Sequence, residues 1–149
     1  MSMEVFLNQY PVVIVLFVLL ACAGMWVVIV KLIGLISGWS KIAQLYPDQP
    51  TAPRILQENW VYGRVGVIFY NGTLVLETTV QGLRIKMMPG FGMGHPTLFI
   101  PWSELQGPET KGKIWLANKY TLSRMPNKAL FFNAGVAQWI EAGRTRSKG

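Results

Sequence analysis

Side chains able to carry out acid–base, nucleophilic or metal chemistry are few in this chain of 149 residues. It has one histidine, His95, one cysteine, Cys22, and seven acidic residues. A protein metal site needs three or four ligands from Cys, His, Asp and Glu. The acidic residues stand singly, without the i, i+3 or i, i+4 spacing that brings helical side chains together, and the sequence contains no nucleophile elbow, phosphate-binding loop or paired carboxylates. We therefore expect a protein that is not an enzyme and that has no cofactor and no metal site.

The alternative of an enzyme would require a polar pocket in which His95 meets Glu77 or Glu104. A lone histidine can serve as a ligand or as a pH-responsive group. No second ligand accompanies His95 in the sequence, so we expect it to be a structural, hydrogen-bonded residue.

Residues 89–96 (PGFGMGHP, the glycine loop) form the most unusual local sequence. The glycines lack the following helix start that a dinucleotide-binding fingerprint requires, and a flexible hairpin loop is the plainer interpretation. Phe91 and Met93 would be exposed apolar tips on such a loop. We expect these two residues and His95 to contact a partner subunit or the membrane.

The net charge is +7. A basic domain can indicate nucleic-acid binding, but basic and aromatic residues do not interleave here as a stacking platform requires, so we expect no nucleic-acid partner. Anionic lipid headgroups are the nearer target, at about 1 kcal/mol per basic residue close to the membrane; a solvated basic face is the alternative. The candidate headgroup-binding residues are Lys31, Lys41, Arg84, Lys86, Lys111 and Lys113.

Residues 12–30 contain no charged side chain. A run of about 18 or more apolar residues can cross the hydrocarbon core, and in lipid it must be helical. A secretory signal would need a basic n-region and an apolar region of about 7–15 residues. A lipoprotein signal would turn polar after the lipobox-like sequence that ends at Cys22, and this sequence stays apolar. We expect a retained membrane anchor.

The Lys and Arg distribution predicts its orientation. No basic residue precedes Pro11, whereas Lys31 and Lys41 follow the apolar run. We therefore expect an extracytoplasmic N-terminus and a cytoplasmic C-terminal domain at a bacterial inner membrane. Tyr10 and Trp39 would mark the two headgroup belts.

Helical spacing of apolar residues continues to Tyr46. The sequence thus predicts an N-terminal tail over 1–10 and a transmembrane helix with an amphipathic cytoplasmic extension over 11–46, bending near Gly38. Small residues in a span permit close helix packing. The candidate contacts with partner helices are Ala21, Ala23, Gly24 and Trp26.

A linker over 47–57 precedes a domain over 58–143 and a basic tail over 144–149. Alternating apolar residues predict strands, with a hairpin turn at Asn71-Gly72, and Asn133 can cap a helix over 134–142. The expected strands are 61–70, 73–80, 83–88, 97–101, 113–117, 120–124 and 128–132. The fold class is therefore an α+β membrane protein: one N-terminal transmembrane helix, then a small antiparallel β-barrel or sandwich of about seven strands with a C-terminal capping helix.

Two phrases, residues 82–85 (GLRI) and 98–105 (LFIPWSEL), look like those of bacterial pleckstrin-homology-like (PH/GRAM-type) domains. Residues 37–41, Tyr46-Pro47 and His95-Pro96 are similar to segments of small bacterial single-pass membrane proteins. The resemblance implies a scaffold that binds lipids or proteins, and it implies no particular reaction.

The expected function is a non-catalytic accessory subunit of a larger bacterial membrane complex. Its partners would be other membrane protein subunits and bilayer lipids, including anionic ones. The alternative is a stand-alone membrane-surface module that binds anionic lipid or a peptide.

Overall fold

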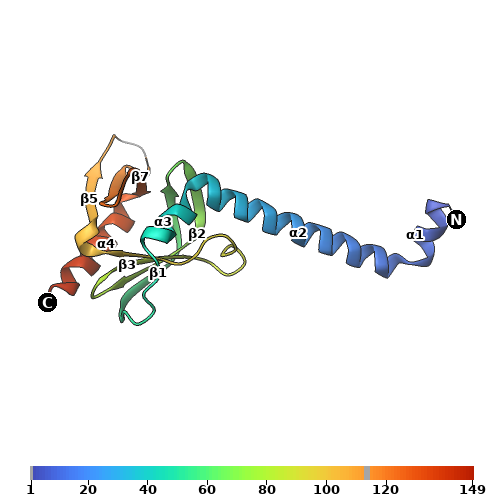
Figure 1. The fold of residues 1–149 in the computed structure, drawn as a ribbon, viewed down its shortest axis with the longest axis horizontal. Helices are drawn as coiled ribbons and strands as arrows, with labels where there is room; N and C mark the ends of the chain where they lie inside the picture. Colours follow the sequence, from blue (N-terminus) through green and yellow to red (C-terminus); the bar gives the residue numbers. More distant parts are fainter. Residues whose placement is uncertain (1, 113–114) are drawn as a thin grey trace.

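The computed structural model describes residues 2–112 and 115–149, and a long helix extends from one side of a β domain (Figure 1). The helices before the domain are α1 (Met3–Gln9), α2 (Pro11–Ser37) and α3 (Trp39–Leu45). Pro11 stands at the start of α2, where its missing N–H costs nothing. Gly38 ends α2 with φ of 81°, a left-handed conformation that glycine adopts without strain.

By length and composition, α2 is apolar enough to cross a membrane. The helix expected over 11–46, with a bend near Gly38, is divided at Gly38 into α2 and α3. The expected N-terminal tail contains the short helix α1.

Seven antiparallel strands form one sheet in the order β4-β3-β2-β1-β7-β6-β5. The strands are β1 (Arg54–Val65), β2 (Ile68–Thr79), β3 (Gly82–Met87), β4 (Leu98–Pro101), β5 (Leu105–Thr110), β6 (Asn118–Leu122) and β7 (Met125–Phe132). The edge strands β4 and β5 are joined only by the short helix η1 (Trp102–Glu104). A sheet whose two edges are joined by three residues must curl back on itself, so the inward faces enclose a core.

The core contains residues from the sheet and from both flanking helices. Trp39 and Ile42 of α3 are fully buried in it, and so is Tyr46 just beyond. The amphipathic stripe predicted for this segment is therefore present, but it covers the sheet rather than the membrane surface. Burying side chains of this size contributes roughly 1.5–3 kcal/mol each.

The helix α4 (Ala134–Ser147) closes the domain at the C-terminal end (Figure 1). Asn133 caps it by accepting a hydrogen bond of 2.9 Å from the Val136 N–H. Ala137 and Ile140 enter the core, and Gly143 lies so close to Thr78 that an added Cβ would stand 2.3 Å from its Cγ2 atom. The basic tail predicted from Arg144 onward is helical as far as Ser147.

The hairpin turn between β1 and β2 lies at Gly66-Val67, so the prediction of a turn at Asn71-Gly72 is wrong. Gly66 and Gly72 both have positive φ, but Gly72 lies within β2, opposite the ring of Tyr62. Val65 pairs with Ile68 across the two-residue turn. The structure also begins β1 inside the predicted linker and adds β5, which was not predicted. The predicted strand over 113–117 falls partly outside the described residues, and 115–117 are not in a strand.

Candidate functional site

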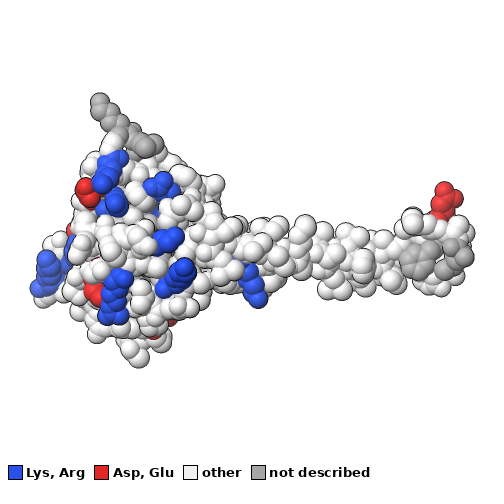
Figure 2. Space-filling model, turned by 45° about the horizontal axis from the view of Figure 1, so that its top comes forward, with Lys and Arg blue, Asp and Glu red and all other residues white. Residues whose placement is uncertain are grey.

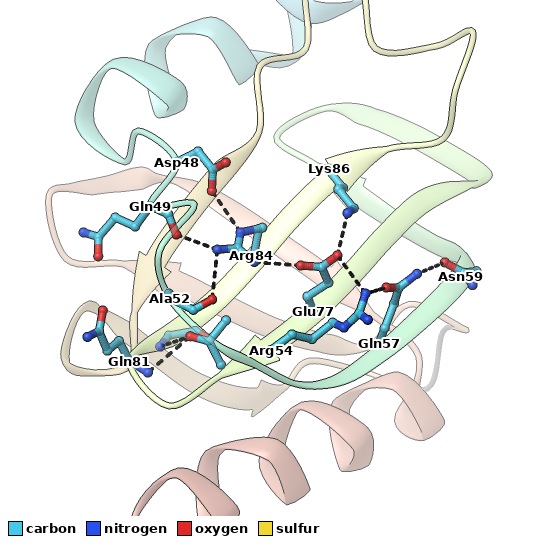
Figure 3. Close-up of polar contacts among 12 residues, drawn as sticks. Asp48, Gln49, Ala52, Arg54, Gln57, Asn59, Glu77, Gln81, Arg84 and Lys86 are labelled. Atoms are coloured by element: carbon cyan, nitrogen blue, oxygen red, sulfur yellow. Dashed lines mark hydrogen bonds and ion pairs between the residues drawn. The ribbon is translucent and has the colours of Figure 1, made fainter.

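Glu77 is the centre of a buried ionic network between β2 and β3 (Figure 3). Its carboxylate accepts from Arg84 Nη1 at 2.7 Å and lies 2.5 Å from Lys86 Nζ. Burial by itself raises the pKa of Glu77, but the hydrogen bonds and charges of Lys86 and Arg84 outweigh it and lower the pKa overall. Glu77 is therefore a fixed carboxylate that balances charge, and it is unsuited to act as a general acid or base near neutral pH.

The Arg84 guanidinium also fixes the segment between α3 and β1 to the sheet (Figure 3). Its Nε donates to Asp48 Oδ1 at 2.9 Å, and Nη2 donates to the carbonyls of Gln49 and Ala52. Arg84 is only 8% exposed. The prediction that it binds lipid headgroups is therefore not supported by its position, because its donors are already occupied inside the protein.

The other predicted headgroup residues differ in their availability. Lys31 and Lys41 are exposed, whereas Lys86 pairs with Glu77 and Lys111 with Glu109. Lys113 lies outside the described residues. Basic side chains predominate on the face of the domain in Figure 2, and the long helix shows uncharged surface over most of its length.

The glycine loop does not project freely but folds back along α2 (Figure 1). Trp26 Nε1 donates to the Gly90 carbonyl at 3.0 Å, and the rings of Trp26 and Phe91 meet edge to face with centroids 5.2 Å apart. Trp26 was predicted to contact a partner helix, and part of its surface contacts the chain's own loop instead. Met93 remains 50% exposed.

Two glycines allow this close approach of the loop to the helix. A Cβ on Gly34 would stand 2.4 Å from the Gly94 carbonyl oxygen. A Cβ on Gly94, whose φ is 73°, would stand 2.9 Å from Lys31 Cα. We call these contacts, with the Trp26–Gly90 hydrogen bond, the helix–loop clamp.

His95 is buried behind the clamp, at 4% exposure. Its Nδ1–H donates to the Met93 carbonyl at 3.2 Å, so in the neutral ring Nε2 accepts from the Tyr70 hydroxyl at 3.0 Å. Burial lowers the pKa of His95, with the Met93 hydrogen bond opposing it, and burial raises the pKa of Tyr70, opposed by a hydrogen bond with Ser37. Both groups are thus held neutral.

Trp39 completes this His95 cluster. Its ring packs against His95 and Tyr70 at centroid distances of 5.1 and 5.6 Å, and its Nε1 donates to the Pro96 carbonyl at 2.7 Å. Trp39 is fully buried, so the prediction that it lies in a headgroup belt is wrong. His95 is also too deeply buried to make the contact with a partner subunit that was predicted for it.

The structure does not bring the candidate acid–base residues together. Glu104 pairs with Arg124 at 2.5 Å, Glu77 pairs with Arg84, and no hydrogen bond or ion pair joins either carboxylate to His95. Within residues 2–112 and 115–149, no three His, Cys, Asp or Glu side chains lie close enough to hold a metal ion.

The predicted span contacts Ala21, Ala23 and Gly24 are all exposed, and a Cβ on Gly24 would meet nothing within 4 Å. Tyr10, at the start of α2, is 41% exposed. Sequence reasoning missed Tyr70 as a partner of His95, and Asp48 as a partner of Arg84. Neither carries a local signal, because each pair is joined only through the tertiary fold.

No known protein-family model, curated protein or solved structure matches the chain.

Proposed function

We propose that α2 is a retained membrane span and that the β domain is a cytoplasmic, PH-like scaffold. In this proposal the chain is a non-catalytic accessory subunit of a larger complex in a bacterial inner membrane. The helix–loop clamp is the observation that carries the proposal. It holds the domain in one fixed orientation on the end of the helix, as a docking subunit requires and a flexibly tethered module does not.

The burial of α2 supports a retained span. Val30, Gly34 and Ser37 are buried against the domain, whereas the most apolar 18-residue window of the helix contains no buried residue. A signal sequence also passes a test of length and composition. Cleavage near Cys22 would still leave Met25, Val28, Leu32, Leu35 and Ile36, each at least half exposed, on a helix outside lipid.

Strand order supports the PH-like assignment. A curled seven-stranded antiparallel sheet followed by one closing helix is the arrangement that the resemblance of residues 82–85 and 98–105 implies. Such a fold fixes no reaction, which agrees with a scaffold role.

Exposure of the small residues supports a subunit role for the span. Lipid tails are as apolar as the helix, so association between spans relies on close packing at small residues. Ala21 and Gly24 lie on one face, three positions apart, and no other part of the described chain covers them. A partner helix could pack closely against Ala21 and Gly24, just as the glycine loop packs closely against Gly34.

Mild-detergent extraction followed by native mass spectrometry tests this function. We expect the wild-type chain to co-purify with larger membrane subunits. Gly24→Leu should weaken that association, and Cys22→Leu, which puts the same bulk on another face, should not. A chain that runs alone at 16.7 kDa under all mild conditions would refute the proposal.

The second candidate, a module that binds anionic lipid, is favoured by Lys31 and Lys41, which are exposed and follow the apolar run in the sequence. Nanodiscs with equal phosphatidylglycerol and phosphatidylcholine would test it on the full chain. Enrichment of phosphatidylglycerol around the wild type, reduced in a variant with both lysines changed to glutamine, would support this candidate. Equal retention of both lipids would remove it.

A further inference from the structure

A cavity of about 170 Å³ lies between α2 and the β domain. One wall is formed by Trp26, Ile29, Val30 and Ile33 of the helix, and the opposite wall by β2, Met87 and Phe91. It is a space that the helix–loop clamp leaves open, and His95 and Tyr70 of the His95 cluster also line it.

The cavity is suited to an apolar occupant. Its lining is largely hydrocarbon and aromatic, and of its polar side chains His95 and Tyr70 already bind each other at 3.0 Å, while Asn71 and Thr73 lie on the β2 side. An ordered buried water needs two to four polar partners, and the helix side of the cavity supplies none. A hydrophobic molecule would restore the packing contacts that the cavity walls lack.

The position of the cavity identifies the source of that molecule. Trp26 lies five residues before Lys31, the first charged residue after the apolar run. At 1.5 Å per residue the cavity therefore begins about 7 Å on the lipid side of Lys31. Trp26 and Ile29 are 44% and 43% exposed, so the cavity is continuous with the surface that faces lipid if α2 spans the membrane.

We infer that the cavity binds the end of one phospholipid acyl chain from the cytoplasmic leaflet. The inference rests on the proposed span. An engineered apolar cavity of about 150 Å³ accepts benzene, so this one accommodates roughly six carbons of a chain. The acyl chain thereby reaches the β2 side of the domain, which lipids around a simple tether would not contact.

Photo-crosslinking in liposomes tests the inference. Full-length protein is reconstituted with a phosphatidylglycerol that carries a diazirine near the end of one acyl chain, and crosslinked peptides are mapped by mass spectrometry. We expect crosslinks on Ile68, Tyr70 or Met87 in addition to those on α2.

Cavity-filling variants provide the matched comparison. Val30→Phe enlarges a buried side chain that lines the cavity, whereas Val28→Phe makes the same change at an exposed position that does not. Val30→Phe should reduce domain crosslinks at least fivefold and Val28→Phe should leave them unchanged. If Val30→Phe does not fold, Thr73→Leu fills the cavity from the sheet side and takes its place.

The outcomes distinguish this inference from the proposed function. Crosslinks confined to α2, or domain crosslinks that persist in the filled variants, overturn the acyl-chain site while leaving the span intact. Complete release of the protein by alkaline carbonate would instead overturn the span itself, and the inference with it.

Discussion

The helix–loop clamp can be tested at Gly34, because the chain provides a matched glycine on the same helix. An added Cβ at Gly34 would lie 2.4 Å from the Gly94 carbonyl oxygen, against 3.4 Å for ordinary contact. In Gly34→Ala the loop must therefore move away by about an ångström. That shift would lengthen the 3.0 Å hydrogen bond between Trp26 and Gly90 beyond hydrogen-bonding range.

The expected magnitude follows from three opposing terms. Overpacking costs about 1–3 kcal/mol, and a lost hydrogen bond costs about 1 kcal/mol. Replacing glycine by alanine in a helix regains about 1 kcal/mol. We expect loop docking to weaken by about 1–3 kcal/mol, which increases local opening by a factor of roughly 5–150.

Hydrogen–deuterium exchange in nanodiscs measures this opening. The informative amides are those of Phe91 and His95, which bond within the loop to Met88 and Gly92. Both should exchange faster in Gly34→Ala, while amides of the sheet stay protected. Gly24→Ala, where an added Cβ meets nothing within 4 Å, should leave loop exchange unchanged. Equal exchange in Gly34→Ala and the wild type would refute the reasoning.

Three further predictions concern the ionic network, the His95 cluster and α4. Glu77→Gln should destabilise the domain by about 3 kcal/mol because it leaves the buried Arg84 with Asp48 as its remaining ion-pair partner and removes the ion-pair partner of Lys86. The exposed Glu58→Gln should change stability by less than about 0.5 kcal/mol in thermal unfolding. Burial lowers the pKa of His95 below its ordinary 6.5, so the unfolded chain binds more protons than the folded chain below pH 6.5. The stability of loop docking should therefore decrease as the pH falls through that range, and hydrogen exchange would measure the decrease. Gly143→Ala should cost about 1–3 kcal/mol by collision with Thr78.

Each of these has its own contrary result. If the Glu77→Gln domain were as stable as the wild type, the ionic network would make no net contribution to the free energy of unfolding. Docking that weakens equally on acidification in His95→Asn would assign the pH effect to another group. Gly135→Ala is the control for α4, because an added Cβ there lies 3.5 Å from its nearest neighbour; a cost at Gly135 equal to that at Gly143 would point to helix backbone effects instead of the contact with β2.

The long helix and most of the strands, but not β5, could be predicted because their signals are local. An uncharged apolar run and alternating side chains each define which surface of an element is apolar, whatever lies around it. The cap at Asn133 is also local, since its partner is three residues away. The ends of the strands were harder to predict. Strand β1 begins at Arg54 because Arg54 pairs with Thr79 of β2, and no local residue pattern specifies that register.

The contacts of the site show where sequence reasoning ends. The apolar stripe at Trp39 and Ile42 was predicted correctly as a stripe, but its periodicity could not distinguish a membrane surface from the interior of a sheet. Arg84 was predicted to bind lipid headgroups, and its partners Glu77 and Asp48 could not be recognised because they lie in other segments of the chain. In both cases the residue type indicated what kind of contact to expect, but the sequence did not show which residues would make it.

The sequence by itself determined a helix apolar enough to span a bilayer, an antiparallel β domain and an excess of basic side chains. Only the tertiary structure decided that the glycine loop folds onto Trp26, that His95 meets Tyr70 and that the helix leaves an apolar cavity against β2. The physical reason is that local patterns specify which face of an element must be covered. What covers that face depends on contacts between residues far apart in the chain, such as the 64 positions between Trp26 and Gly90.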